Sequence, residues 1–271
     1  MNGHRWLILG LGAMLLLPLA VSAAAFYELA TVATPGIFVN VSPLATPTAT
    51  AASGDAAYLA GLAAYEAGDY ALAERHLRTA LAFAPDDARR HNSLGLVLAR
   101  LGRLDEALAL YRRALALNPL LAEAHYNLGA LYHAQGQLEQ AIAAYRAAIQ
   151  ARPDFALAYN NLGAAYTDLG RSDEALAAYA QAIAHDPTLV VAHLNLGMAY
   201  ARRGDLARAA TELEAVVRLD PASVKGHFHL GLVRVRQGQV AQARAAFERV
   251  IALAPESEWA TLARRRLERL K

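Results

Sequence analysis

The stretch HYNLGALYHAQGQLEQAIAAYRAAIQARP, residues 125 to 153, contains the pattern that decides the fold. Its two glycines, one of its alanines and its closing proline recur every 34 residues. The four series are Pro85, Pro119, Pro153, Pro187, Pro221 and Pro255; Gly61, Gly95, Gly129, Gly163, Gly197 and Gly231; Gly68, Gly102, Gly136, Gly170, Gly204 and Gly238; and Ala73, Ala107, Ala141, Ala175, Ala209 and Ala243. Four series that stay in register through six copies indicate six tandem structural units.

The first half of each unit has the periodicity of a helix with one buried face. Counted from residue 54, positions 4, 7, 8 and 11 of a unit share a face at about 100° per residue. A glycine inside a helix costs about 1 kcal/mol relative to alanine. Six glycines at position 8 therefore predict that a second helix packs too close for a methyl group. Ala141 and its equivalents are expected to be the small residues facing them.

The second half of each unit reads as that second helix. Gly136 and its equivalents stand where a helix end requires a left-handed residue. Acidic residues follow in the first turn of the second helix, as in LDEA and SDEA, where the helix dipole favours negative charge. Tyr111, Tyr145, Tyr179 and Phe247 lie on its buried face, and the proline closes the unit.

This pattern resembles the tetratricopeptide repeat (TPR) family, whose period and G…Y…A…F…P pattern match residues 125–153 position by position. The resemblance covers residues 54 to about 257. Departures are small residues in the first copy, at Ala57, Ala60 and Ala64, and Arg234 at the usual tyrosine position of the sixth. The resemblance implies an all-α, right-handed superhelical α-solenoid of antiparallel helix pairs, whose concave groove binds protein segments.

The period fixes the predicted boundaries. The units are 54–87, 88–121, 122–155, 156–189, 190–223 and 224–257. Such units bury their apolar faces against neighbours, so the last one requires a polar cover. Residues 258–271 supply a capping helix, with Trp259, Leu262, Ala263, Leu267 and Leu270 at helical spacing and Arg264, Arg265 and Arg269 outward. Residues 26–53 are rich in Thr, Ala and Pro and read as a linker.

The amino terminus indicates export. His4 and Arg5 precede the apolar run WLILGLGAMLLLPLAV, and small residues follow it. Residues 1–25 therefore read as a signal peptide, cleaved after Ala23 or Ala25. The apolar stretch can equally be read from residue 6 to residue 26 as a membrane anchor. Both alternatives place the repeats outside the cytoplasm.

A row of amides marks the predicted binding site. Position 6 lies about 200° from position 4, so it faces away from the packed side and toward the groove. It is occupied by Asn127, Asn161 and Asn195, flanked by Ser93 and His229. Because an amide both donates and accepts, such a row suits the backbone of an extended peptide. Arg202 and Arg236, at position 13, are candidates for ligand carboxylates.

The row resembles the asparagine ladder in the superhelical repeats of O-linked N-acetylglucosamine transferase, although no catalytic domain follows here. In the alternative interpretation, these amides hydrogen-bond between adjacent helices. Asn160, at position 5, stands at the edge of the row and is expected to bond a neighbouring helix or water.

Other classes of function have little support. The chain has no cysteine, which excludes disulfides and thiolate catalysis, and its net charge of +2 does not favour nucleic acid. Four of its nine histidines recur at position 4, where they read as substitutes for a packing aromatic, so no metal site is expected. No motif for catalysis or for a cofactor is found. The prediction is a scaffold or adaptor that is not an enzyme and binds a protein or peptide. The alternative is a structural or self-assembling subunit of an envelope complex, with an unused groove.

Overall fold

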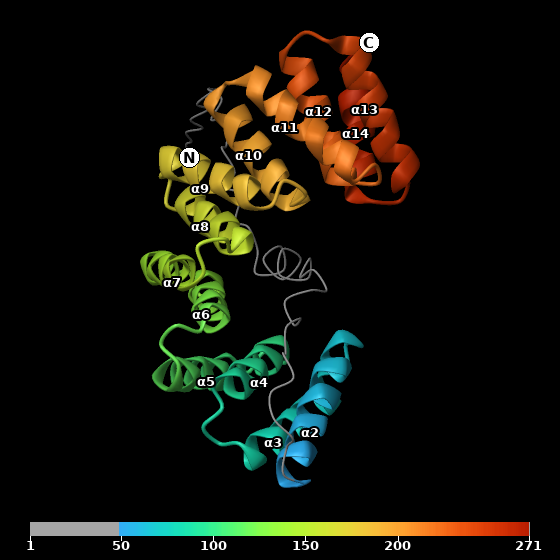
Figure 1. Cartoon of the computed structure of the whole chain (residues 1–271). Helices are drawn as coiled ribbons and strands as arrows, with labels where there is room; N and C mark the ends of the chain where they lie inside the picture. The colour runs from blue at the N-terminus through green and yellow to red at the C-terminus, as the bar shows by residue number, and fades with distance from the viewer. Residues whose placement is uncertain (1–48, 271) are drawn as a thin grey trace, which may run out of the picture. The chain divides into compact units, whose positions relative to one another are not determined.

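The computed structural model describes residues 49–270 of the chain, with side chains from Ser53 onward. They lie in the second of two compact units, Pro43–Lys271. They form thirteen α-helices and no strand (Figure 1). The helices are α2 (Ala49–Glu66), α3 (Tyr70–Phe83), α4 (Ala88–Arg100), α5 (Leu104–Leu117), α6 (Ala122–Ala134), α7 (Leu138–Ala151), α8 (Ala156–Asp168), α9 (Ser172–His185), α10 (Val190–Arg203), α11 (Leu206–Leu219), α12 (Val224–Arg236), α13 (Val240–Leu253) and α14 (Glu258–Glu268).

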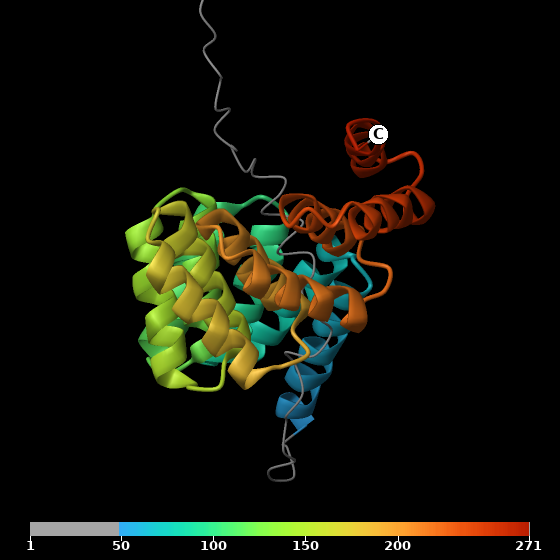
Figure 2. The ribbon, with the colours of Figure 1, turned by 90° about the horizontal axis from the view of Figure 1, so that it is seen from above.

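The helices pair in chain order, and each pair contacts the next. The first helices are α2, α4, α6, α8, α10 and α12, and the helix that follows each of them is the second helix of its pair. Each second helix also packs on the first helix of the following unit, as Figures 1 and 2 show for α9 and α10. Sequential pairing of this kind is the predicted all-α solenoid of antiparallel helix pairs.

One boundary differs from the prediction. Helix α2 begins at Ala49, within the range predicted as linker. The segment ATAAS, residues 49–53, is rich in alanine, the strongest helix former. It lengthens the first helix at its amino-terminal end, ahead of residue 54. The predicted signal or anchor and the rest of the linker lie outside the described residues. Among residues 49–270, no helix combines the length and apolarity that crossing a bilayer requires.

The position-8 glycines lie under a large side chain of the second helix. A Cβ added to Gly163 would lie 2.7 Å from the ring of Tyr179, and one on Gly129 would lie 2.8 Å from the ring of Tyr145. Leu77, Tyr111, Leu213 and Phe247 cover the other four glycines. The predicted close approach is confirmed. The ring or leucine sixteen residues after the glycine fills the space, which the sequence did not predict. Ala141 and its equivalents are buried, and at Gly197 the backbone oxygen of Ala209 lies 3.3 Å from the added Cβ.

The turns follow the sequence prediction. Gly136 has a φ of 72°, and the five equivalent glycines have φ values between 74° and 90°. This left-handed conformation ends each first helix at little cost only for glycine. Acidic side chains occupy the first turn of several second helices, including Asp105 and Glu106 in α5. These turns fold each unit back on itself.

The buried core is shared between neighbouring units. One cluster joins Leu98 and Tyr111 of the second unit to Leu128 and Leu131 of the third. Another runs from Tyr145 of the third unit to Leu196 of the fifth. A single helix pair could bury neither cluster alone, so the stack depends on contacts between units.

Helix α14 covers the last pair. It begins at Glu258, 34 residues after the start of α12 at Val224. It therefore occupies the place of the first helix of a seventh unit. Ala260 and Ala263 are fully buried, and the ring of Trp259 lies 5.0 Å from that of Phe228, centroid to centroid. Arg264, Arg265 and Arg269 are exposed. The helix therefore has the apolar and charged faces that a cap requires.

The glycine–ring contact leads to a stability prediction. Gly163→Ala places a methyl group against the ring of Tyr179, which is only 3% exposed. Overpacking of this kind costs about 1–3 kcal/mol, while removing a helical glycine recovers about 1 kcal/mol. We expect a net loss of up to about 2 kcal/mol, measured by thermal or urea unfolding. In a Tyr179→Val background, Gly163→Ala should lower the free energy of unfolding by less than it does in the unchanged chain. A Gly163→Ala variant more stable than the unchanged chain would contradict this packing.

Candidate ligand-binding face of the first helices

Polar side chains of successive first helices are joined by one repeated hydrogen bond. In each case a residue at position 6 bonds the residue at position 5 of the preceding unit, 35 residues earlier. The bonds are Tyr58 Oη to Ser93 Oγ at 3.0 Å, Asn127 Nδ2 to Asn92 Oδ1 at 2.9 Å, Asn161 Nδ2 to Tyr126 Oη at 3.0 Å and Asn195 Nδ2 to Asn160 Oδ1 at 3.0 Å. We call these eight residues the amide ladder. It runs across α2, α4, α6, α8 and α10.

Asn160 is a central member of the amide ladder. It is only 3% exposed. Its Oδ1 accepts the bond from Asn195, and its Nδ2 donates to Asn161 Oδ1 at 3.1 Å. The expectation that it bonds a neighbouring helix is confirmed. The same pattern, a polar residue at position 5 followed 35 residues later by one at position 6, was visible in the sequence and would have predicted the ladder.

The ladder leaves hydrogen-bonding groups open at two positions. Asn127 and Asn195 are half-buried, and each uses one amide N–H in the ladder. Among the described residues, nothing bonds the side-chain oxygen or the second N–H of either. Asn161 both donates and accepts within the ladder. Ser93 is 2% exposed and bonded to Tyr58, so it belongs to the packing between units and not to the surface.

The ladder ends at the sixth unit. His229 occupies position 6, but the residue it would meet is Leu194, which cannot hydrogen-bond through its side chain. The His229 ring instead lies 6.0 Å from the ring of Trp259 in α14. Burial, together with the positive charges of Lys225 and Arg202, lowers the pKa of His229 to about 4. The ring is therefore neutral at pH 7.

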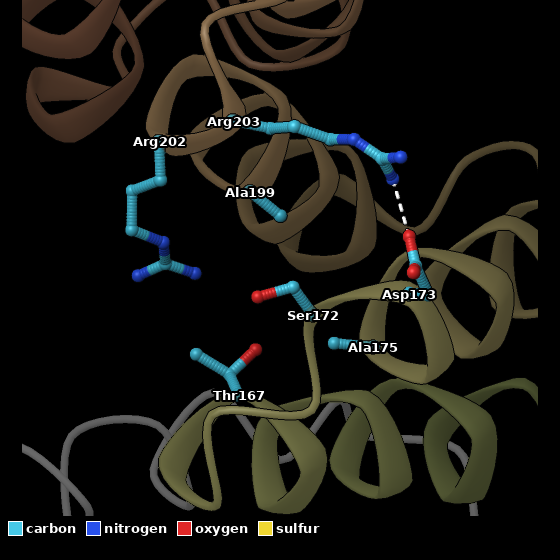
Figure 3. Close-up of a pocket in the computed structure, with 7 residues that line it drawn as sticks. All are labelled: Thr167, Ser172, Asp173, Ala175, Ala199, Arg202 and Arg203. Atoms are coloured by element: carbon cyan, nitrogen blue, oxygen red, sulfur yellow. Dashed lines mark hydrogen bonds and ion pairs between the residues drawn. The ribbon is translucent and has the colours of Figure 1, made fainter.

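Position 13 forms a second set of contacts between units. Arg100 Nε donates to Tyr65 Oη at 3.1 Å, and Arg236 Nη1 donates to the carbonyl oxygen of Ala201 at 2.5 Å. Arg202 differs, because it is exposed and no hydrogen bond or ion pair joins it to another described residue. It lines a hollow of about 470 Å³ between α8, α9 and α10 (Figure 3). Of the two predicted carboxylate-binding arginines, Arg202 is thus the one with a free guanidinium.

Positions 6, 9 and 13 of the first helices together form a surface that we call the first-helix face. Position 9 carries Leu62, Leu96, Ala130, Ala164, Met198 and Leu232, all half-buried. Small residues therefore stand beside the open amide of Asn127, and larger apolar ones stand toward both ends. The face offers hydrogen bonds, apolar contact and one unpaired cation, which are the elements of a binding surface.

The position-4 histidines hold turns together. Nε2 of His91, His125, His193 and His227 lies 2.8–3.1 Å from the carbonyl oxygen of the proline six residues earlier. Each thus anchors the turn that precedes its own helix, a role beyond the predicted aromatic packing. No group of acidic or histidine side chains within residues 49–270 is arranged to hold a metal ion. Arg234, which departs from the repeat pattern, pairs with Glu214 of the preceding unit.

Sequence comparison agrees with this architecture. Profiles of the tetratricopeptide repeat match residues 54–79, 97–136, 131–170, 156–189 and 192–258. The chain belongs to the tetratricopeptide repeat family. A comparison with curated proteins gives no significant match.

Solved TPR structures are similar over most of their length. PilF of Pseudomonas aeruginosa has a TM-score of 0.73 and 18% identity, and the match covers 83% of this chain and 100% of PilF. PilW, a type IV pilus biogenesis factor, has a TM-score of 0.70 and 19% identity, and the match covers 77% of this chain and 97% of PilW. YrrB, a TPR protein with an unusual peptide-binding site, has a TM-score of 0.57 and 23% identity, and the match covers 70% of this chain and 97% of YrrB. At these identities the likeness establishes the fold alone.

The half-buried His229 is expected to make stability depend on pH. Its pKa is about 4 in the folded chain and about 6.5 when unfolded. Between these values only the unfolded chain binds the proton, so the stability present above about pH 6.5 is lost as the pH falls toward 4. We expect the free energy of unfolding to drop less between pH 7 and pH 5 in His229→Gln than in the unchanged chain. An equal drop in both proteins would show that His229 does not contribute.

A double-mutant cycle measures the ladder. Asn160→Ala and Asn195→Ala should each destabilise the chain, and the two changes should couple by about 0.5–1.5 kcal/mol because they remove the same hydrogen bond. Asn127→Ala with Asn195→Ala is the matched control, since these residues share no bond and should be additive. Urea unfolding supplies all the values. Additive behaviour of Asn160 with Asn195 would remove the bond from the account.

Proposed function

We propose that this TPR protein is an exported or membrane-tethered scaffold that binds an extended segment of a partner protein along the first-helix face. The observation that carries the proposal is the set of open amide groups on Asn127 and Asn195, held in place by the ladder bonds that each residue makes. A side chain fixed by one hydrogen bond loses little additional entropy when it forms another. The ladder thereby preorganises the face for a ligand.

The spacing suits a peptide backbone. Neighbouring helices pack about 8–10 Å apart, and an extended chain advances about 3.3 Å per residue. A segment crossing the first helices therefore passes about three residues per unit. The open oxygen and N–H of one amide match the N–H and C=O that each peptide residue presents.

Affinity from the amides alone is weak. At about 0.5–1.5 kcal/mol per hydrogen bond, a few such bonds support only millimolar binding, which requires about 4 kcal/mol. Selectivity must come from neighbouring side chains. The small residues at Ala130 and Ala164 leave room for ligand side chains, while Met198 and Leu232 offer apolar contact. His229 and Arg236 stand at the carboxyl-terminal end of the same face and complete the proposed set.

Fold relatives support the class of function but not the ligand. YrrB is described as having a peptide-binding site and PilW as a pilus biogenesis factor, and both have this fold. Such analogy speaks to what the fold permits. Export rests on the amino-terminal apolar run.

Site-specific photocrosslinking of the full chain in its native host tests the proposal. A photoreactive phenylalanine replaces Ala134, which is exposed at position 13 of α6, or Ala143, which is exposed on the second helix α7. We expect a partner protein to crosslink at position 134 and not at 143. Asn127→Ala with Asn195→Ala should reduce that crosslink by about tenfold, given about 1.4 kcal/mol per factor of ten.

The matched control changes two exposed amides on second helices, Gln150→Ala with Gln181→Ala, and should leave the crosslink unchanged. Circular dichroism must show that all variants stay folded. Equal crosslinking at positions 134 and 143, or no effect of the asparagine changes, would contradict the proposal. Crosslinks only between copies of this chain would favour the self-assembling structural subunit instead.

A further inference from the structure

Arg202 interrupts a contact that other units form. At position 13, Arg100 bonds Tyr65, Asp168 bonds His133 Nε2 at 2.8 Å, and Arg236 bonds a backbone carbonyl, each with position 12 of the preceding unit. The equivalent partner of Arg202 is Thr167. Its hydroxyl lies 3.2 Å from Tyr179 Oη and is hydrogen-bonded to it. No hydrogen bond joins Thr167 to Arg202, so Arg202 lacks the contact that this register forms in the three other units.

The guanidinium of Arg202 faces a defined hollow. Figure 3 shows it directed into the same space as the side chains of Ser172 and Thr167, which come from α9 and from the end of α8. Ser172 is exposed, and its hydroxyl bonds no other described residue. The cation and the Ser172 hydroxyl are thus both available to a group that enters the hollow.

The charge in the hollow is unbalanced. Its lining has three charged side chains, Asp173, Arg202 and Arg203. Arg203 Nη1 donates to Asp173 Oδ1 at 2.5 Å, so this pair neutralises itself. Helix α9 begins at Ser172, and the two carboxylates of its first turn, Asp173 and Glu174, are each paired with an arginine. One uncompensated positive charge remains, at Arg202.

We propose that the hollow binds a carboxylate of the partner segment, with Arg202 forming the ion pair and Ser172 donating from its hydroxyl. The planar guanidinium matches the two oxygens of a carboxylate. A phosphate dianion would keep one negative charge unpaired, because Arg203 is engaged with Asp173. Arg202 follows Asn195 by seven residues on α10, two helical turns along one face. A segment held at Asn195 is therefore within reach of the hollow.

This inference rests on the proposed function for the source of the carboxylate, but small probes test the hollow without the partner. Amide NMR spectra of the full chain are recorded with N-acetylglutamate amide, with its neutral counterpart N-acetylglutamine amide, and with N-acetylalanine. The first carries a side-chain carboxylate and the third a carboxyl-terminal one. Whichever of these two carboxylates binds more tightly shows whether the site takes a side-chain or a carboxyl-terminal carboxylate of the partner. With the carboxylates we expect the amide chemical shifts of Ser172 and Thr167 to change and to saturate with a millimolar dissociation constant. The neutral amide should change neither shift.

Two variants assign the effect. Arg202→Gln should weaken carboxylate binding at least tenfold, while Arg218→Gln, which removes an exposed cation from α11 outside the hollow, should leave it unchanged. Equal shifts with the neutral amide, no shifts with either carboxylate, or binding that survives Arg202→Gln would overturn the assignment. If carboxylates bind here but Ala134 gives no partner crosslink, the proposed function fails and the anion site stands. If a partner crosslinks but no carboxylate binds, the anion site fails and the proposed function stands.

Discussion

The contact between a glycine of the first helix and a large side chain of the second sets the geometry of every unit. At Gly163 the ring of Tyr179 occupies the space where a Cβ would be. This contact holds the two helices in one orientation, and it recurs in all six units. Because each pair has nearly the same shape, the next pair meets it in nearly the same way. The regularity of the stack thus begins inside the pair.

Regular stacking explains why one hydrogen bond recurs at a separation of 35 residues. The period brings equivalent residues side by side, and the additional residue reflects the offset between adjacent first helices. Asn127 and Asn195 consequently join their units to the preceding ones while presenting their remaining amide groups outward. The surface that joins the units is also the surface proposed to bind ligand. Ligand binding and stack stability are therefore expected to influence each other.

The sequence predicted the helix pairs, the left-handed turns and the place of the amide row, because each depends on residues a few positions apart or one period apart. It did not identify Tyr145 as the side chain that lies against Gly129, since periodicity shows which residues are buried but not which of them touch. It grouped Arg202 with Arg236, although only the structure distinguishes the free guanidinium from the bonded one. Arg236 bonds the backbone carbonyl oxygen of Ala201, whereas Arg202 points into the hollow, and spacing does not encode this choice of arginine rotamer.

Amide hydrogen exchange of the full chain, with and without Tyr179→Ala, tests the central claim most directly: that each unit is set by its glycine contact and supported by its neighbours. Removing the ring should reduce protection most in α8 and α9, less in the flanking helices α6, α7, α10 and α11, and least in α2, α3, α13 and α14. A uniform loss across all thirteen helices, or a loss confined to α8 and α9, would contradict the account.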